Sequence, residues 1–372
     1  MKKMWLIIFA VTILLGIACA LYLTGKVANA GIFDRIETRS LRKLAAFVVV
    51  ALAVAVLIAV FDVTNAIIII IHVAVFLLLG DLVGFVLRHY FGSGLSPLIF
   101  DAAALICCVA YLCVGWYLMH GLWETDYFLA TPKDIGTLRI AHIADSHIGC
   151  GFSGKGFAEK LAVIEAADPD ILMITGDFVD DDTSKQDMLD ACAALGDLNI
   201  KYGIYFCFGN HDRGYSDGSS RGYTGDDLTE ALTQNGVTVL EDESVLIDGR
   251  FYVIGRADAG YGNSAREDIA SLISDLDRDR YMIVLDHQPT DYEAEEAAGV
   301  DLVLSGHTHG GQIFPLEYIQ TIVSENDAVS GLTRRGDTDF IVTDGISDWA
   351  IKFKTGCKSE YNIITVNTQD QT

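Results

Sequence analysis

Residues 302–312 read LVLSGHTHGGQ, a short apolar run that ends at two histidines set between glycines. Four other apolar runs in the second half of the chain end at similar polar clusters: Asp145-Ser146-His147, Gly176-Asp177, Gly209-Asn210-His211-Asp212 and Asp286-His287. Runs of this length and composition are typical of buried strands. Because ligands of open α/β sheets bind at the carboxyl ends of strands, we expect the five clusters to meet along one edge.

Short strands and helical segments alternate through this half of the chain. The five apolar runs cover Leu138–Ala144, Ile171–Thr175, Ile204–Phe208, Met282–Leu285 and Leu302–Ser305. Segments of helical composition or period are Ala158–Ala167, Lys185–Leu198, Asp226–Asn235, Ala265–Leu276 and Asp291–Ala298. Additional strands are expected within Val237–Ile254, at Asp339–Thr343 and at Tyr361–Val366. The alternation predicts an α/β sandwich.

The first third of the chain is much more apolar than the rest. Four stretches approach the roughly 20 apolar residues that cross a bilayer: Trp5–Thr24, Leu44–Phe61, Ala66–Leu87 and Leu98–Met119. The first is longer than the roughly 7 to 15 apolar residues of a signal-peptide core, so an uncleaved anchor is favoured over a cleaved signal. We expect a transmembrane domain over residues 1–123, a linker at 124–136 and an α/β domain over 137–372.

Charge is divided unevenly between these parts. Residues 1–123 carry eight Lys/Arg and five Asp/Glu, so the total formal charge of −24 leaves −27 for residues 124–372. No nucleic-acid partner is expected, because phosphate contacts need Lys and Arg. The expected partners are the lipid bilayer and the substrate.

Basic residues near the spans predict their orientation. Lys2 and Lys3 precede the first span, and the following loop carries Lys26, Arg35, Arg39, Arg42 and Lys43. The more basic loop is expected in the cytoplasm, which after three further crossings places the α/β domain on the outer face of the cell membrane.

Asp, Asn and His side chains supply oxygen and nitrogen donors that suit divalent Mn, Fe or Zn without any thiolate. The ordered blocks Asp-x-His, Gly-Asp-x-x-Asp, Gly-Asn-His-Asp, a lone His and Gly-His-x-His resemble the calcineurin-like metallophosphoesterase superfamily. The longer Gly306-His307-Thr308-His309-Gly310-Gly311-Gln312 with Pro315 is similar to its membrane-associated bacterial phosphodiesterase branch. The resemblance covers about residues 137–366 and implies a four-layer α/β/β/α sandwich behind the four spans.

The resemblance also implies a role for each polar residue at the strand ends. It implies two divalent metal ions, one held by Asp145, His147 and His309 and the other by Asn210, His287 and His307, with Asp177 bridging them. His211 would contact the phosphoryl group or protonate the leaving oxygen, with Asp212 fixing its ring. Asp180 would orient a ligand without being one.

Three other features of the sequence could belong to a functional site. His142 precedes the first block by three residues, and strand alternation favours a structural role for it. Gly149–Lys155 matches the Gly-x4-Gly-Lys of a phosphate-binding loop, but Gly156 stands where that loop needs Ser or Thr, which favours a flexible loop. Trp349, Lys352 and Lys354 lie where the resembling branch often has an arginine, so substrate contacts there are open.

The chain is therefore predicted to be a membrane-anchored, metal-dependent phosphoesterase that acts on a phosphodiester or pyrophosphate. Anchoring beside the bilayer favours a lipid-linked substrate. The alternative within the enzyme class is hydrolysis of soluble nucleotides or cell-envelope polymers. The alternative from another class is a membrane scaffold that retains a dead catalytic fold. The sequence does not predict the oligomeric state.

Overall fold

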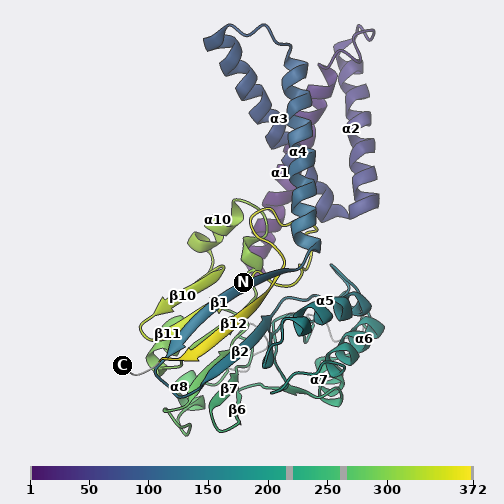
Figure 1. Ribbon diagram of the computed structural model, residues 1–372. Helices are drawn as coiled ribbons and strands as arrows, with labels where there is room; N and C mark the ends of the chain where they lie inside the picture. Colours follow the sequence, from purple (N-terminus) through teal and green to yellow (C-terminus); the bar gives the residue numbers. More distant parts are fainter. Residues whose placement is uncertain (1, 215–220, 260–265, 370–372) are drawn as a thin grey trace. The chain divides into compact units, whose positions relative to one another are not determined.

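The computed structural model describes residues 2–214, 221–259 and 266–369 (Figure 1). By its internal contacts the chain divides into two compact units, Met1–Gly115 and Trp116–Thr372. Within the described residues, long helices make up the first unit, and short strands and helices make up the second.

The helices of the first unit are long and almost entirely apolar: α1 (Lys2–Ala28), α2 (Arg39–Phe61), α3 (Val63–Phe91) and α4 (Pro97–His120), the last of which continues into the second unit. Each contains a stretch long and apolar enough to cross a membrane. Asp62 separates α2 from α3, and its carboxylate accepts a hydrogen bond from the Asn65 N–H at 2.9 Å, which caps α3. The four predicted apolar spans are therefore confirmed as four long apolar helices.

The first unit carries a cluster of charged side chains within its apolar helices. Lys26 Nζ lies 2.8 Å from Asp81 Oδ1 and 2.5 Å from Asp101 Oδ1. The Tyr22 hydroxyl donates to the other oxygen of Asp81 at 2.9 Å. An unpaired charge is costly in a membrane, so this pairing explains how the spans accommodate two carboxylates.

Two six-stranded sheets form the centre of the second unit. The first has the order β1-β12-β2-β3-β4-β5. Its strands are β1 (Trp123–Thr131), β2 (Thr137–Ile143), β3 (Ile171–Thr175), β4 (Ile204–Cys207), β5 (Val237–Val239) and β12 (Glu360–Thr368). Strands β2, β3, β4 and β5 are parallel, so the ends of β2, β3 and β4 reach the same edge.

The second sheet has the order β10-β11-β9-β8-β7-β6. Its strands are β6 (Glu243–Ile247), β7 (Phe251–Gly255), β8 (Tyr281–Leu285), β9 (Leu302–Ser305), β10 (Gly331–Arg335) and β11 (Thr338–Val342). Strands β7, β8, β9 and β11 are parallel, which brings the ends of β8 and β9 to one edge as well.

Three apolar cores hold four layers together. Helices α5 (Gly154–Ala166), α6 (Lys185–Gly196) and α7 (Gly225–Gln234) pack on the outer face of the first sheet. The two sheets pack face to face through a second core, and α8 (Ile269–Leu272) and α9 (Tyr292–Ala298) cover the second sheet through a third. The predicted α/β/β/α sandwich is therefore confirmed.

Two expectations differ from the structure. The linker expected at residues 124–136 is occupied in large part by β1, which pairs in parallel with β12 from the far end of the chain. Nothing local reveals that partner, and the alternate residues of β1 stay exposed, as expected for an edge strand. The helix expected at Ala265–Leu276 is reduced to the four residues of α8, and residue 265 lies outside the described residues.

A buried ionic network ties β8 to α9 next to the strand-end clusters. Arg256 NH1 lies 3.0 Å from Asp286 and 3.2 Å from Glu295, and all three side chains are almost fully buried. Arg266 NH1 lies 2.7 Å from the same Asp286 carboxylate. Burial raises the pKa of Glu295 well above its usual value, because it disfavours the ionised carboxylate. The Arg256 guanidinium acts in the opposite direction, since its positive charge stabilises the ionised form.

Replacing Arg256 with alanine is expected to destabilise the chain, because it removes the guanidinium that contacts the buried Glu295 and leaves Asp286 with Arg266 alone. The expected cost is about 3–5 kcal/mol, measured as a lower thermal midpoint of the detergent-solubilised chain. Arg280→Ala is the matched control, since Arg280 and Asp277 are each about half exposed and such pairs contribute less than about 1 kcal/mol. Equal shifts for the two variants would contradict the structural role of the network.

Candidate metal centre

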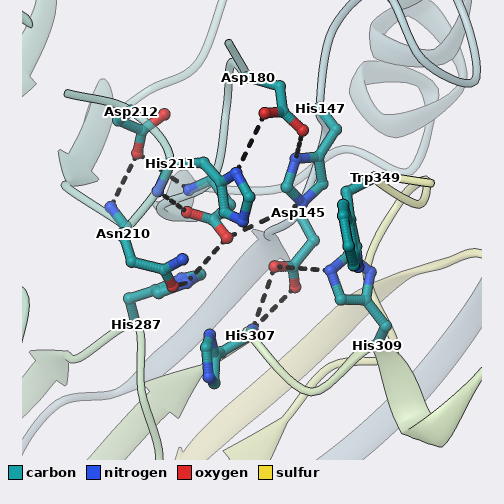
Figure 2. Close-up of polar contacts among 12 residues, drawn as sticks. Asp145, His147, Asp180, Asn210, His211, Asp212, His287, His307, His309 and Trp349 are labelled. Atoms are coloured by element: carbon teal, nitrogen blue, oxygen red, sulfur yellow. Dashed lines mark hydrogen bonds and ion pairs between the residues drawn. The ribbon is translucent and has the colours of Figure 1, made fainter. Parts of the chain in front are cut away.

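The polar clusters that follow the strands meet at the edge shared by the two sheets. Asp145 and His147 follow β2, Asp177 follows β3, and Asn210 follows β4. His287 follows β8 of the other sheet, and β9 is followed by His307 and His309. Seven residues from five strands thus converge, as Figure 2 shows for those that it labels.

One group of donors consists of Asp145, His147 and His309. Each offers a ligand atom, and these atoms all lie within 4.8 Å of one another. His309 Nε2 lies 3.6 Å from Asp145 Oδ1, and the rings of His147 and His309 stack with their centroids 5.1 Å apart. All three side chains are buried.

A second group consists of Asp177, His287 and His307, whose ligand atoms also lie within 4.8 Å of one another. His287 Nε2 lies 3.2 Å from Asp177 Oδ2 and 3.2 Å from Asn210 Oδ1. The other ring nitrogen, Nδ1, contacts the Thr175 carbonyl oxygen at 2.8 Å. A backbone carbonyl behind one ring nitrogen leaves the other free to bind a metal ion.

The residues present fit a pair of divalent cations. His147 Nδ1 lies 3.1 Å from Asp180 Oδ2, while the buried His147 Nε2 has no hydrogen-bond partner. A buried ring nitrogen without a hydrogen-bond partner is costly. His147 belongs to the donor group of Asp145 and His309, so a metal ion bound there would supply that partner. Carboxylate, amide and imidazole donors suit Mn, Fe and Zn, and the geometry does not select among them.

Burial sets the protonation of several of these donors. It lowers the pKa of His307 to about 3 and that of His309 well below the usual value, so both imidazoles are neutral. It also raises the pKa of Asp145 to about 6. Neutral imidazoles keep a lone pair available for a cation, and a cation would in turn favour the ionised form of the carboxylate.

Asp180 connects two histidines. One of its oxygens faces His147 Nδ1 and the other faces His211 Nδ1, each at 3.1 Å (Figure 2). Burial alone would raise the pKa of Asp180, but these two contacts hold it well below its usual value. Burial alone would likewise lower the pKa of His211, yet the contact with Asp180 and the charge of Asp177 raise it to about 9.

The role expected for Asp212 is different in the structure. Its carboxylate accepts hydrogen bonds from four backbone N–H groups, those of Asp177, Phe178, Val179 and Gly209, at 2.7–3.0 Å. The prediction that Asp212 fixes the His211 ring is therefore wrong. Asp180, three residues after Asp177, holds that ring, because the turn after β3 brings its carboxylate across.

Five of the seven donor residues have a positive φ angle, a backbone conformation that residues other than glycine rarely adopt. The φ angle is 55° at Asp145, 38° at His147, 49° at Asp177, 72° at His307 and 52° at His309. Each such residue costs on the order of 1–3 kcal/mol and persists where the surrounding structure enforces it. Strain concentrated at these residues is typical of a functional site.

Glycines allow the donor loops to approach one another. A side chain at Gly209 would lie 2.3 Å from Asp177 Oδ1, and one at Gly306 would lie 2.6 Å from Asp145 Oδ2. Both distances are too short for any side chain, so glycine is required there. The glycines of the two blocks thus clear space around the carboxylates.

Sequence reasoning did not find Asp348. This buried residue accepts a hydrogen bond from Gln312 Nε2, and its Oδ1 lies 3.9 Å from His309 Nδ1. Burial raises the pKa of Asp348 to about 7. The signal that could have found it is the acidic cluster after the strand expected at Asp339–Thr343, which repeats the pattern of the other strand ends.

The remaining candidates lie around the centre. The Trp349 ring is 6.0 Å from the His211 ring, measured between centroids. Lys354 is fully buried, and its Nζ donates to the Asp344 carbonyl oxygen at 2.5 Å. His142 is fully buried and contacts the Thr175 hydroxyl at 2.8 Å. Residues 149–152 form turns and bends, and α5 then begins at Gly154 with Ser153 as its N-cap.

A four-layer α/β/β/α sandwich with carboxylate and imidazole donors at the strand ends defines the class of metal-dependent phosphoesterases. The model of the calcineurin-like phosphoesterase family matches residues 138–311. An uncharacterized metallophosphoesterase of Aquifex aeolicus is 31% identical over 195 residues, which cover 51% of this chain and 70% of that protein. The chain belongs to the calcineurin-like phosphoesterase family.

Two further relatives resemble the chain over a similar region. An uncharacterized metallophosphoesterase of Campylobacter jejuni is 30% identical over 233 residues, and a transmembrane protein with metallophosphoesterase domain of Bos taurus is 27% identical over 249 residues. The similarity covers 62% of this chain in both cases, and the chain spans 59% and 53% of the lengths of these two proteins.

Removing the charge of Asp180 is expected to weaken metal binding, because His147 would lose the group that orients its ring. Asp180→Asn should lower the metal affinity by about 10- to 100-fold, measured by titrating Mn²⁺ or Zn²⁺ into the full chain after chelation. Asp182→Asn is the matched control, since Asp182 is exposed two residues away. Unchanged affinity of the Asp180 variant would exclude this role.

Proposed function

We propose that the chain is a membrane-anchored binuclear metal-dependent phosphoesterase that hydrolyses a phosphodiester or pyrophosphate. The observation that carries the proposal is the convergence of seven donor residues that follow five strands. Six of them form two groups that are wholly or largely buried, and the seventh, Asn210, lies 3.2 Å from His287 of the second group. Asp145, His147 and His309 would hold one ion, Asn210, His287 and His307 the other, and Asp177 would bridge them. Two bound divalent cations would lower the pKa of a water molecule and neutralise charge on the phosphoryl oxygens.

Asp177 is suited to the bridging position by its contacts. Its Oδ2 lies 3.2 Å from His287 Nε2 and 3.8 Å from His147 Nε2, so it faces one histidine from each donor group. Its Oδ1 accepts a hydrogen bond from the His211 backbone N–H at 2.8 Å, which fixes the carboxylate between the groups.

His211 is suited to the general acid. Its pKa of about 9 keeps the imidazole protonated at neutral pH, and Asp180 holds the Nδ1 side of the ring. The opposite nitrogen can then donate a proton to the leaving oxygen as the phosphorus–oxygen bond breaks. The Trp349 ring lies on one side of His211, with the two ring centroids 6.0 Å apart.

His211→Ala is expected to lower kcat by about 10²- to 10⁴-fold, because the leaving oxygen would depart without its proton. Metal content and the thermal midpoint should stay as in the unchanged chain, since His211 is outside the proposed ligand set. Both are measured on the same sample by elemental analysis and by thermal unfolding. A variant that retains full turnover would remove His211 from the reaction.

A lipid-linked phosphoester is the substrate that the anchored site favours. The four apolar helices are long enough to cross a bilayer and would hold the domain beside it, and a relative of the same family is named a transmembrane protein. Soluble nucleotides and cell-envelope polymers are the alternative substrates. In nanodiscs, the full chain should hydrolyse lipid-linked phosphodiesters or pyrophosphates with a kcat/KM at least about tenfold above that for soluble phosphodiesters, which corresponds to about 1.4 kcal/mol.

A membrane scaffold with a dead catalytic fold is the alternative from another class. Turnover that disappears with a chelator, returns with Mn²⁺, Fe²⁺ or Zn²⁺ and is lost in a folded Asp177→Asn variant would exclude it. The orientation is proposed from the loop that carries Lys26, Arg35, Arg39, Arg42 and Lys43, which places residues 124 onward on the outer face. Protection of this region from protease in intact cells would reverse that orientation.

A further inference from the structure

The segment that follows the two histidines of β9 carries a cluster of exposed apolar side chains. Helix α10 (Leu316–Val323) has no buried residue. Ile322 is 83% exposed, and five other large apolar residues of the segment are at least 39% exposed: Phe314, Leu316, Tyr318, Ile319 and Val323. Glu317 is its one charged residue. We name residues 314–323 the apolar helix segment. Such a patch on a folded domain marks an interaction surface.

The apolar helix segment is attached firmly to the metal-binding loop. The short 3-10 helix His309–Gly311 leads directly into it. At Gly311, a side chain would lie 2.5 Å from the Glu317 Cα, so the backbone of α10 packs directly on the loop. The helix therefore lies directly against the loop that carries His309.

The segment is also linked to the last turn of α4, within the second unit. The Phe314 N–H donates to the Thr355 hydroxyl at 3.2 Å, and the Thr355 N–H donates to the Gln312 carbonyl oxygen at 2.9 Å. Two residues earlier, the Phe353 ring lies 5.9 Å from the Trp116 ring. Residues 353–355 thus run from the end of the fourth predicted span to the start of the apolar helix segment.

Aromatic residues indicate where that span ends. Trp116 and Tyr117 lie in the last turn of α4, and Trp123 follows it by three residues. Tyr117 is 62% exposed, and its ring contacts that of Trp123 at 5.4 Å. Trp and Tyr concentrate at the boundary between lipid and water, so this end of the second unit lies at that boundary.

We propose that the apolar helix segment inserts into the lipid surface at the boundary marked by Trp116 and Tyr117. Large apolar residues, an interfacial Tyr and a single charge are the composition of a helix that lies in the membrane plane, with its apolar face about 5–10 Å deep. A second copy of the chain fits less well, because a stable interface buries roughly 800 Å² per partner and an eight-residue helix offers much less.

Insertion would place the His307 and His309 loop against the bilayer. This part of the inference rests on the proposed function: the metal centre would then reach phosphoesters carried by lipids before those in free solution. The insertion itself does not depend on catalysis, so the two can be tested separately.

The test uses the full chain with Ile322→Trp in phospholipid vesicles, with and without lipids brominated on their acyl chains. Bromine quenches only tryptophan that enters the lipid, and the unchanged chain in the same vesicles provides the background from its own tryptophans. The emission added by residue 322 is expected to fall by more than about half for a residue at this depth.

Leu246→Trp is the matched control, because Leu246 is 46% exposed and β6 lies at the opposite end of the second unit from α10 (Figure 1). Its added emission should not respond to brominated lipids. Tyr318→Trp provides a second, more conservative probe of the segment if Ile322→Trp does not fold. Equal, low quenching at residues 318, 322 and 246 would overturn the inference, as would emission at 322 that changes only with protein concentration.

A second variant tests the consequence for the substrate. Ile322→Lys should raise the apparent KM for a vesicle-borne phosphodiester by at least about fivefold, because a charge opposes insertion. Turnover of a soluble phosphodiester should be unchanged. Equal effects on both substrates would overturn the positioning role. If the unchanged chain hydrolyses neither substrate, the proposed function fails, while the quenching result still decides whether the segment inserts.

Discussion

The geometry of the candidate centre depends on the carboxylate of Asp212. Four backbone N–H groups donate to it, three from the turn after β3 and one from the turn after β4. Burial and the charge of Asp177 raise the pKa of Asp212 to about 6, and the backbone N–H groups oppose that rise by stabilising the ionised form. One buried side chain therefore holds together the two turns that carry Asp177 and Asn210.

The same turns hold their residues in strained conformations. Positive φ angles at the donor residues carry a cost that regular strands and helices avoid. The parallel strands behind the turns are fully buried between two cores, so they fix where each turn begins. The sandwich thus supports an edge at which acidic and imidazole side chains are packed together. Buried carboxylates are costly unless they are paired or bind a metal ion, so this arrangement suits bound cations.

The exposed surfaces of the second unit differ in character. Its outer helices expose charged residues. The segment after the Gly-His-x-His block instead exposes large apolar residues, and its backbone packs against the loop that carries His309. A few residues of chain therefore connect this exposed apolar surface to the metal centre.

The sequence by itself determined the family, the α/β sandwich, the spans and the residues that gather at the strand ends, because each depends on local patterns such as apolar runs and the short polar blocks that end them. Only the tertiary structure decided how those residues pair. It assigned Asp180, and not Asp212, to the His211 ring, brought Asp348 close to His309, and paired β1 with β12. These contacts join positions separated by about 30 to more than 200 residues. No local pattern encodes such pairings, since they follow from how the turns pack once the two sheets meet.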